Sequence, residues 1–450
     1  MTTDDVLSPT LPIDLVPNFS HSYSFSGRQV TKTVILNGHK ISRSFPSKGL
    51  EKSDAFAAWW RAFLDNQDQY RYPESESGFS TESLNYIDLF SSAGGLSLGF
   101  EEAAKTLGFR AIPQLAIDID EAALGIHRFN HNTQRVLHES VSSVVDFKVL
   151  GQGTNARFAF DPEIVNTEVK SLINKIDVVL AGPPCQGHST LNNYSRSNDP
   201  RNLLYLTVPA MAVALNVPIV IIENVPNVLN DSDNVVDSTV TLLKHRGYEI
   251  SGQVLQAHLL GWPQTRKRYF LVATKNHSPV DLGVLSQYFE RETLGVGWAL
   301  ENVRTQSAQE GINLMDSVAE MSQLNQERIQ WLFENDAYEL PNHIRPVCHQ
   351  DGHTYPSVYG RMSWDKPAPT LTTGYVSPGR GRFIHPLEKR VLTPREASRL
   401  QGFPEWFNFS PNNESPSKRG QLAKWIGDAV PSILGYVAGL SALIEKRSQI

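Results

Sequence analysis

The sequence predicts an α/β protein built on a doubly wound, Rossmann-like sheet, and three observations support this class. First, short apolar strand-like segments at residues 86–90, 112–117, 178–181, 219–222 and 269–273 alternate with helix-like segments such as 96–107 and 203–215. Second, small or polar residues follow several of these strands directly, where such sheets place their ligands. Third, 40% hydrophobic and 20% charged residues are typical of an ordinary globular protein.

The length of 450 residues predicts two or three domains. The strand–helix alternation assigns an α/β domain to residues 84–275, completed by a C-terminal helix within 424–450 that we expect over residues 425–443. Residues 276–423 form a second domain, because the alternation is lost there and Gly, Pro, His and aromatic residues become frequent. Residues 141–175 are interpreted as an insertion without an assigned role.

Residues 1–83 are predicted to form an α+β extension. Two segments rich in β-branched residues, 28–36 and 39–45, flank Asn37-Gly38, which is a strong hairpin signal. Ser53 or Asp54 caps a helix whose apolar residues recur at helical spacing, and residues 73–83 are typical of a linker. The extension is expected either to enlarge the surface that meets a binding partner or to mediate association.

The charge distribution favours a polyanion as partner. The net charge is −6, but residues 342–425 contain 12 Lys and Arg against 6 Asp and Glu. A basic segment on an acidic body suits a protein that meets nucleic acid on one face. Two cysteines exclude a disulfide framework, and the absence of an export signal or an apolar run of about 18 residues favours a cytoplasmic protein without a membrane span.

The first candidate site is the turn after residues 86–90, Ile87-Asp-Leu-Phe-Ser-Ser-Ala-Gly-Gly-Leu96. Small residues between a strand and a helix let a ligand approach the backbone and the helix N-terminus. The turn is neither GxGxxG nor a P-loop, which weakens a dinucleotide site. Asp118 and Asp120 end the next strand, where a carboxylate can accept bonds from both ribose hydroxyls of an adenosine ligand.

Three further polar groups follow apolar strands. Cys185 lies in Gly182-Pro-Pro-Cys-Gln-Gly-His-Ser189, a segment too polar for a core, although a lone cysteine is more often an inert buried residue. Glu223 follows four apolar residues, and a helix-capping carboxylate is the alternative. Arg266 and Arg268 precede the strand at 269–273 on one predicted face, where they can stabilise an anion.

These segments resemble the DNA cytosine-5 methyltransferase family, most closely its bacterial and phage restriction–modification members. The matching motifs are Asp88-Leu-Phe with Gly94-Gly95, Pro184-Cys185-Gln186, Glu223-Asn224-Val225, Gln264-x-Arg266-x-Arg268, residues 390–404, and Gly427-Asp-Ala-Val-Pro431. Six motifs in this order make a chance match implausible. The resemblance covers residues 86 to about 435 and implies a Rossmann-like S-adenosylmethionine-dependent methyltransferase domain with a smaller target-recognition domain at 276–423.

The resemblance implies roles for individual residues. Cys185 is the nucleophile that adds to cytosine C6, Glu223 holds the base at N3 and the exocyclic amine, and Arg266 and Arg268 support the reacting groups. The cofactor candidates are Phe90, Ala93, Gly94, Gly95, Leu96, Asp118, Ile119, Glu139, Pro184, Leu204 and Val430. The DNA candidates are Gln186, Ser189, Arg201, Arg361, Thr370, Arg380 and Arg382, with Arg361 as the base reader and Arg380 and Arg382 as phosphate contacts. No metal is expected.

Two positions depart from the family pattern. Ile119 stands where many members have an aromatic ring over the adenine, and His188 stands where phenylalanine is common. The expected substrate is double-stranded DNA whose target cytosine is flipped out. The protein is expected to be a monomer that acts beside a cognate restriction endonuclease.

Three alternatives stay open at this point. A tRNA methyltransferase shares this scaffold, but the Cys-Phe-Thr triplet of that branch is absent. A catalytically silent DNA-binding paralogue is disfavoured by the intact Cys185, Glu223 and arginines. A nicotinamide-dependent oxidoreductase explains the alternation but none of the later motifs.

Overall fold

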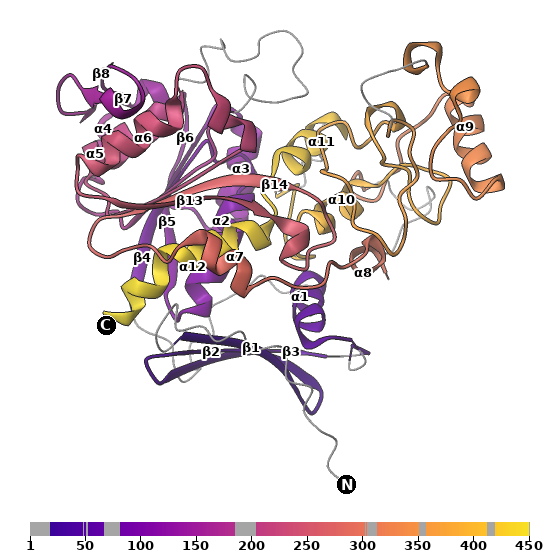
Figure 1. Cartoon of the computed structure of the whole chain (residues 1–450), viewed down its shortest axis with the longest axis horizontal. Helices are drawn as coiled ribbons and strands as arrows, with labels where there is room; N and C mark the ends of the chain where they lie inside the picture. The colour runs from indigo at the N-terminus through magenta and orange to yellow at the C-terminus, as the bar shows by residue number, and fades with distance from the viewer. Residues whose placement is uncertain are drawn as a thin grey trace.

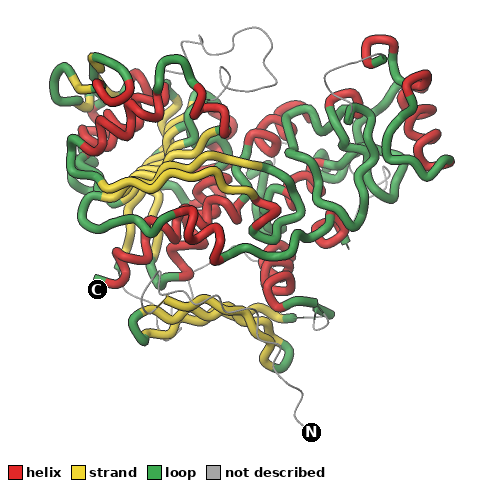
Figure 2. Tube along the Cα trace, viewed as in Figure 1, coloured by secondary structure: helices red, strands yellow, loops and turns green. Residues whose placement is uncertain are grey.

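A seven-stranded sheet forms the centre of the computed structural model, which describes residues 19–47, 49–50, 53–66, 82–184, 204–301, 303, 313–350, 357–411 and 419–449 (Figures 1 and 2). The strand order is β13-β14-β12-β11-β4-β5-β6. The bounds are β4 (Ser83–Leu89), β5 (Arg110–Asp118), β6 (Val136–His138), β11 (Val178–Ala181), β12 (Ile219–Asn224), β13 (Glu249–Gln256) and β14 (Lys267–Thr274). Only β14 runs antiparallel to its neighbours, so the α/β class is confirmed with a mixed rather than an all-parallel sheet.

Helices cover both faces of this sheet. The helices are α2 (Gly95–Thr106), α3 (Glu121–His131), α5 (Thr207–Leu215), α6 (Val235–Lys244), α7 (Leu282–Tyr288) and α12 (Ser432–Ser448). Successive strand residues point to opposite faces. Leu180 and Ile221 therefore share one core with α2, α7 and α12, while Val179 and Ile222 share the other with α5 and α6.

The strand and helix predictions were right where the apolar pattern is strong and wrong where it is weak. The five predicted strands are present, but β6 has only three residues and β13 alternates with polar residues, so the sequence missed both. The single C-terminal helix expected over 425–443 is instead α11 (Arg419–Asp428) and α12, because Pro431 lacks the N–H needed to continue a helix. This helical stretch is long and apolar enough to cross a membrane, but 94% of its apolar window is buried inside the protein, as in a core helix.

The N-terminal part contains a three-stranded antiparallel sheet and a helix. The elements are β1 (Phe19–Ser26), β2 (Gln29–Leu36), β3 (His39–Pro46) and α1 (Ala55–Asp65). The predicted Asn37-Gly38 turn is confirmed, with both residues at positive φ, and Asp54 caps α1 by accepting from the Ala57 N–H at 3.1 Å. The sequence missed β1, whose Ser residues alternate with aromatic and His residues. Most of the predicted linker lies outside the described residues, and β4 already begins at Ser83.

This small sheet packs on α2 and α12 through charged groups as well as apolar ones (Figure 1). Lys32 and Arg43 both bind the carboxylate of Glu102 in α2, with Arg43 Nη1 at 2.7 and 2.9 Å from its two oxygens. Lys32 Nζ also lies 3.9 Å from the centre of the Trp59 ring. The N-terminal part is therefore anchored to the helix that follows β4.

The segment predicted as an insertion forms two small ribbons at one end of the central sheet. Its elements are η1 (Val141–Ser143), β7 (Val145–Asp146), β8 (Val149–Leu150), η2 (Gly153–Asn155), β9 (Arg157–Phe158), β10 (Glu163–Ile164) and α4 (Thr167–Lys170). β7 pairs with β10, and β8 pairs with β9.

Residues 276–423 are mostly loops with short helices, in agreement with the loss of alternation. Besides α7 and α11, the elements of this part are α8 (Val296–Leu300), α9 (Gln323–Glu334), η6 (Asn342–Ile344), η7 (Val347–His349), η8 (Pro378–Arg380) and α10 (Pro394–Leu400). Two further short helices, η4 (Pro226–Asn230) and η5 (Ala257–Leu259), belong to the central region. The described residues between 313 and 411 form a second lobe, and α9 lies at its far edge (Figure 1). α9 packs there on a small apolar core that is separate from the two large ones. The large core contains residues from all three predicted domains, such as Val30, Leu180 and Met362, so the domain boundaries stay a prediction.

Candidate active site at the carboxyl ends of the strands

The candidate site lies where β4 and β11 are neighbours at the centre of the sheet. The chain leaves β4 for α2 on one face and approaches α5 on the other after β11, and such a switch point opens a crevice at the strands' carboxyl ends. Residues that follow β4, β5, β11 and β12 therefore meet at one edge. Cys185, Gln186, His188, Ser189 and Arg201 lie outside the described residues.

The loop between β4 and α2 has an unusual backbone. Phe90, Ser92 and Gly94 have φ angles of 57°, 46° and 94°, a left-handed conformation that costs energy for the two non-glycine residues. Asp118, at the end of β5, holds the loop by accepting from the Ser92 N–H at 2.8 Å. Its other oxygen accepts from the Asp120 N–H at 2.9 Å, so the carboxylate orders the turns after two strands.

This loop fits a polar ligand that approaches the backbone. The buried hydroxyls of Ser91 and Ser92 have no hydrogen-bond partner within the described residues, which leaves two polar groups for a ligand. A Cβ on Gly95 would lie 3.1 Å from the Val430 carbonyl oxygen, so glycine is what allows the segment before α12 to approach. The glycine-lined loop and its free hydroxyls are compatible with S-adenosylmethionine.

The remaining cofactor candidates differ in exposure. Ile119 is 74% exposed, Glu139 is exposed, and Phe90, Pro184 and Leu204 are half-buried. The buried candidates are Ala93, Gly94, Gly95, Leu96 and Val430.

A buried polar network packs against this loop, and its two histidines, His127 and His131, were not among the residues predicted from the sequence. Asp88 accepts from the Ser97 hydroxyl at 2.7 Å and lies 3.2 Å from His127 Nε2. A Cβ on Gly94 would lie 2.3 Å from His131 Nε2, so a larger residue does not fit here. Burial lowers the pKa of His127, which keeps this ring neutral near pH 7.

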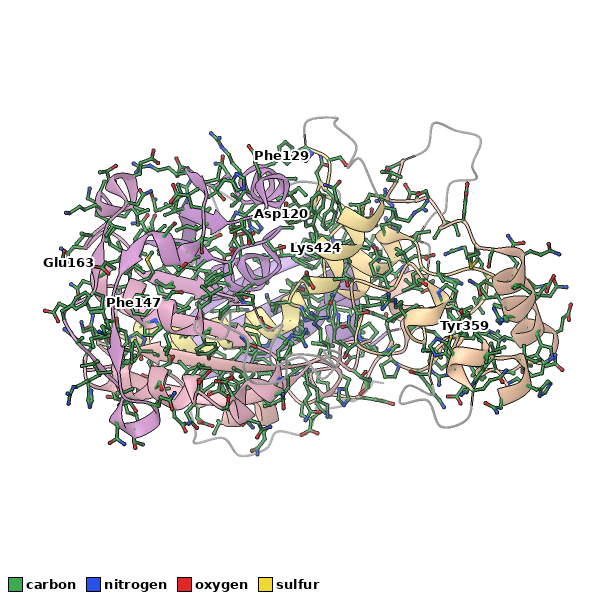
Figure 3. The ribbon with its side chains drawn as sticks, turned by 90° about the horizontal axis from the view of Figure 1, so that it is seen from above. Asp120, Phe129, Phe147, Glu163, Tyr359 and Lys424 are labelled. Atoms are coloured by element: carbon green, nitrogen blue, oxygen red, sulfur yellow. The ribbon has the colours of Figure 1, made fainter. Side chains whose placement is uncertain are left out.

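Helix α3 is linked to α11 through Asp120. Asp120 caps α3 and also accepts from the Trp425 indole N–H at 3.0 Å and from Lys424 Nζ at 3.3 Å (Figure 3). Burial opposes ionisation of this carboxyl, but the Trp425 and Ala123 hydrogen bonds outweigh it and lower its pKa. Asp120 therefore acts as a link between helices.

Glu223 is the central carboxylate of the site. It lies near the end of β12 at 8% exposure, and its Oε1 is 2.7 Å from Arg268 Nε. Burial raises the pKa of Glu223, while the charges of Arg268 and Arg266 oppose the rise. Asn224 donates to the Pro183 carbonyl oxygen at 3.1 Å, which ties the end of β12 to the segment that leads into Cys185.

The two predicted arginines have different partners. Arg268 binds Glu223, whereas the buried Arg266 donates from Nη1 to the carbonyl oxygens of Leu371 at 2.6 Å and Gly427 at 3.1 Å. Arg266 thus joins the start of β14 to the second lobe and to the segment before α12. The sequence placed both on one face but could not separate these partners.

Asp428 is a further carboxylate at this edge that the candidate set omitted. Burial raises its pKa, the charges of Lys424, Arg266 and Arg268 oppose the rise, and Asp118 adds to it. Its position after Gly427 in the last motif was the available signal.

The DNA candidates within the described residues fall into two groups. Arg361 and Arg382 are held inside the lobe: Arg361 donates to the Pro386 carbonyl oxygen at 2.9 Å and lies over Phe333, and Arg382 donates to the Tyr338 carbonyl oxygen at 3.2 Å. Arg380 is exposed. Thr370 is half-buried and precedes Leu371, whose carbonyl oxygen binds Arg266.

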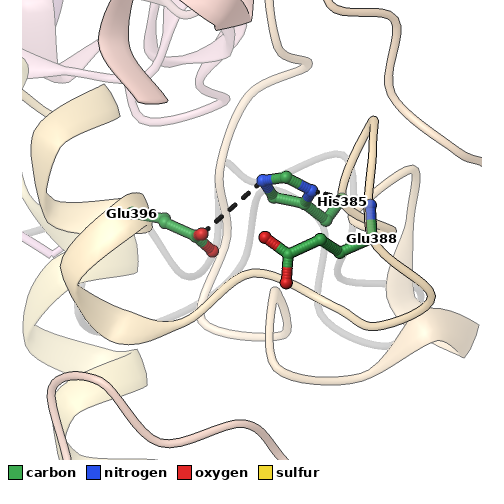
Figure 4. A group of neighbouring side chains, drawn as sticks. All are labelled: His385, Glu388 and Glu396. Carbon is green, nitrogen blue, oxygen red and sulfur yellow. Dashed lines mark hydrogen bonds and ion pairs between the residues drawn. The ribbon is translucent and has the colours of Figure 1, made fainter. Parts of the chain in front are cut away.

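One cluster of potential metal ligands occurs in the described part of the chain, formed by His385, Glu388 and Glu396 (Figure 4). Arg390 binds both carboxylates, at 2.8 Å from Glu388 and 2.6 Å from Glu396. His385 Nδ1 accepts the Glu388 N–H at 3.0 Å. Arg390 therefore holds both carboxylates in one ion-pair network beside His385.

Comparisons with known proteins agree with this architecture. The family described as C-5 cytosine-specific DNA methylase matches residues 84–438. Type II methyltransferase M1.BsuMI of Bacillus subtilis is 40% identical over 435 residues, which cover 95% of each chain. Type II methylase M.HgiDII of Herpetosiphon aurantiacus is 30% identical over 368 residues, covering 79% of this chain and 94% of its own.

Two solved structures share the fold. A prophage-encoded DNA modification methyltransferase of E. coli is 26% identical with a TM-score of 0.50, covering 80% of this chain and 98% of its own. The methyltransferase EhMeth of Entamoeba histolytica has a TM-score of 0.51 at 18% identity, covering 81% and 99%, and it bears on the fold alone.

Proposed function

This chain belongs to the C-5 cytosine-specific DNA methylases, and from that premise we propose that Cys185, Glu223 and Arg268 form the pocket in which a flipped-out cytosine is methylated. The reaction of the family is transfer of a methyl group from S-adenosylmethionine to C5 of cytosine in DNA. The proposal concerns which residues carry it here.

The observation that carries the proposal is the Glu223–Arg268 pair at the edge of the sheet beside the Pro183-Pro184 segment. The carboxylate is buried, its pKa is raised, and a guanidinium lies 2.7 Å away. A carboxyl group in this state can donate a proton or a hydrogen bond to a ring nitrogen near neutral pH. Asn224 donates to the Pro183 carbonyl oxygen, which ties the end of β12 to the segment that precedes Cys185 in the chain.

The chemistry begins with the thiolate of Cys185, which adds to cytosine C6. The C6–S bond forms while Glu223 supplies a proton or hydrogen bond at N3, and electron density moves to C5. The bound cofactor supplies an electrophilic methyl group on a sulfonium. After transfer, a base removes the C5 proton, N3 returns to Glu223 any proton that it received, and the C5–C6 double bond re-forms as the C6–S bond breaks to release the Cys185 thiolate.

The other residues position the partners. The loop from Phe90 to Leu96, with Asp118, Ile119, Glu139, Pro184, Leu204 and Val430, is proposed to bind S-adenosylmethionine. Arg268 supports the base, and Arg266 fixes the edge against the second lobe. Since C6 is inaccessible in a stacked duplex, the target nucleotide has to be extruded into the pocket.

DNA is the substrate class, and we propose that residues 276–423 read the target sequence. Arg361, Thr370, Arg380 and Arg382, together with Gln186, Ser189 and Arg201, are the proposed contacts. Since Arg361 and Arg382 are held inside the lobe, the exposed Arg380 is the best-supported phosphate contact. We further propose a cytoplasmic monomer that protects DNA from a cognate endonuclease, with domains at 1–83, 84–275 completed by 424–450, and 276–423.

The test uses tritiated S-adenosylmethionine with mixed-sequence DNA, followed by bisulfite sequencing to locate the modified cytosines. The wild type should label DNA and not RNA. Cys185→Ser should abolish transfer while DNA affinity stays unchanged. The chain has only one other cysteine, the exposed Cys348, and Cys348→Ser is the matched control that should keep full activity. Turnover by Cys185→Ser would eliminate this residue as the nucleophile.

A further inference from the structure

Helix α1 lies outside the part of the chain that matches the family, yet it is deeply buried. The match begins at residue 84, whereas α1 ends at Asp65, and nine of its eleven residues are buried. One of them is Arg61, at 3% exposure. A buried guanidinium is costly unless its donors find partners, so the partners of Arg61 indicate what this helix does.

The second lobe is connected to the central region by two segments of the chain, and α1 contacts both. The entry segment, residues 296–301, contains α8 and precedes the lobe. The exit segment, residues 394–406, begins with α10 and leads back toward α11. Figure 1 shows α1 beside α8, between the N-terminal sheet and the second lobe. Domain hinges lie in such connecting segments, so contacts at these segments limit how the lobe can turn.

Arg61 binds the entry segment. Its Nη1 and Nη2 donate to the carbonyl oxygens of Trp298 and Glu301. In the opposite direction, Trp298 Nε1 donates to the Ala57 carbonyl oxygen at 3.1 Å. Trp298 and Glu301 lie at the end of α8, where the last carbonyl oxygens have no partner within the helix. Arg61 therefore holds the end of the entry segment against α1.

The C-terminal end of α1 binds the exit segment through the main chain. The Leu64 carbonyl oxygen accepts from the Glu405 N–H at 2.9 Å. The Asn66 carbonyl oxygen accepts from the Trp406 N–H at 3.1 Å. Main-chain groups cannot shift without moving the backbone, so these two hydrogen bonds fix the exit segment against the end of the helix.

Asp65 joins these two sets of contacts. Arg61 Nε donates to one oxygen of Asp65 at 3.0 Å, and Arg399 Nη2 in the exit segment donates to the other at 2.6 Å. Arg399 is 2% exposed, and its Nε also donates to the Ala299 carbonyl oxygen of the entry segment at 2.8 Å. The entry segment, the exit segment and α1 thus meet in one ion-pair network drawn from three separate parts of the chain.

The other side of α1 is fixed to the central region. The Trp60 ring meets the Trp262 ring edge-on, with centroids 5.7 Å apart. A Cβ on Gly261 would lie 2.7 Å from Phe56 Cε1, so the turn before β14 passes directly over α1. Trp262 Nε1 also donates to the Leu400 carbonyl oxygen of the exit segment at 2.8 Å. Helix α1 therefore spans the joint between the central region and the second lobe.

We propose that α1 is a clamp for the second lobe, in which Arg61, Asp65 and Arg399 hold the entry and exit segments so that the lobe keeps one orientation toward the candidate active site. The inference rests on the proposed function, which assigns the reading of DNA to residues 276–423. A duplex has to contact the lobe and present its cytosine to the strand edge at the same time. The clamp raises the fraction of molecules whose lobe is oriented for this, and Arg61 is thus a positioning residue for DNA binding.

The first test measures the orientation of the lobe directly. In a Cys185→Ser background, spin labels are attached to Cys348 in the second lobe and to a cysteine that replaces the exposed Arg128 of α3. Electron–electron double resonance then gives the distribution of distances between the two labels. Arg61→Met removes the donors and should broaden this distribution. Asp65→Asn, a near-isosteric change at a side chain that is 47% exposed, should broaden it in the same way.

Lys32→Met is the matched control. Lys32 is another buried cation of the N-terminal part, at 2% exposure, but its partners Glu102 and Thr106 lie in α2. The variant loses a buried ion pair without touching the entry or the exit segment, and Arg43 still binds Glu102. It should lower Tm and leave the distance distribution as narrow as in the labelled parent chain.

The second test measures binding in chains that retain Cys185. If the competent orientation falls to about one-tenth of the molecules, Arg61→Met should bind DNA about 10-fold more weakly. Its affinity for S-adenosylmethionine, measured by equilibrium dialysis, should be unchanged, because Arg61 binds the entry segment rather than the loop after β4. Lys32→Met should keep the wild-type affinity for both.

The outcomes separate this inference from the proposed function. A distribution as narrow in Arg61→Met and Asp65→Asn as in the control, or equally broad in all three variants, overturns the clamp. Broad distances together with wild-type DNA affinity support the clamp and refute the reading of DNA by residues 276–423.

Discussion

Replacement of Glu102 by glutamine is expected to loosen the N-terminal sheet from helix α2. The Glu102 side chain is 3% exposed and neutralises two buried cations, Lys32 and Arg43, at the interface between that sheet and the helix. Glutamine is almost isosteric, so the substitution removes the charge and little else. The variant then has to bury two positive groups without a counter-charge.

The expected loss of unfolding free energy depends on whether each of the two cations can lose its proton. Removing one partner of a buried ion pair costs about 3–5 kcal/mol. Burial and the charge of Arg43 already lower the pKa of Lys32 to about 7, even though Glu102 raises it, so Lys32 can lose its proton in the variant. Arg43 cannot. We therefore expect a loss of about 3 kcal/mol in unfolding free energy at pH 8 and a larger loss at pH 6.

Urea unfolding of the full chain at both pH values measures this difference. Asp161→Asn is the control, because it breaks an ion pair with Arg246 in which the acid is 82% exposed, and such pairs contribute about 0–1 kcal/mol. If Glu102→Gln unfolds within about 1 kcal/mol of the wild type at pH 6, the triad does not anchor the sheet. The N-terminal sheet would then be held by its apolar contacts with the large core rather than by the ion pairs.

Three further outcomes follow from contacts described above. In Gly99→Ala the new Cβ would lie 2.4 Å from the Ser432 carbonyl oxygen, so α2 and α12 must separate by about 1 Å. Thermal unfolding should show a loss of about 1–3 kcal/mol, with a higher KM for S-adenosylmethionine; an unchanged Tm contradicts the tight packing. Burial raises the pKa of Glu102, but Arg43 and Lys32 outweigh it and lower the pKa to about 2. The stability from this group is therefore present above pH 4.5 and lost as pH falls toward 2, a loss of about 3 kcal/mol that Glu102→Gln should lack in acid titrations. Arg380→Ala should weaken binding to all DNA sequences alike and reduce the salt slope by about one, with no change in Tm, whereas Arg361→Ala should lower Tm. Equal DNA affinity of Arg380→Ala and wild type at several salt concentrations excludes a phosphate contact.

The sequence predicted features that depend on neighbouring residues. The Asn37-Gly38 hairpin turn and the apolar run into Glu223 are both local signals, and the structure has both. The family motifs also predicted which segments contribute to the site and in what order they follow along the chain. A strand that is very short, or that contains many polar residues, has only a weak apolar pattern. The sequence therefore missed β6 and β13.

Features that depend on long-range packing could not be predicted. Arg266 donates to carbonyl oxygens that follow it by 105 and 161 residues, and nothing near Arg266 indicates them. The different partners of Arg266 and Arg268 likewise depend on which strand and loop each side chain faces.

The segment from Ala429 into α12 has a consequence for biosynthesis. Gly95 in the loop after β4 lies close to Ala429 and Val430, and α12 lies along α2, so an edge that begins before residue 100 is completed only by residues beyond 428. A chain still emerging from the ribosome lacks this wall until α12 has been made. A chain that stops before residue 429 is therefore expected to lack the complete edge and to leave DNA unmethylated.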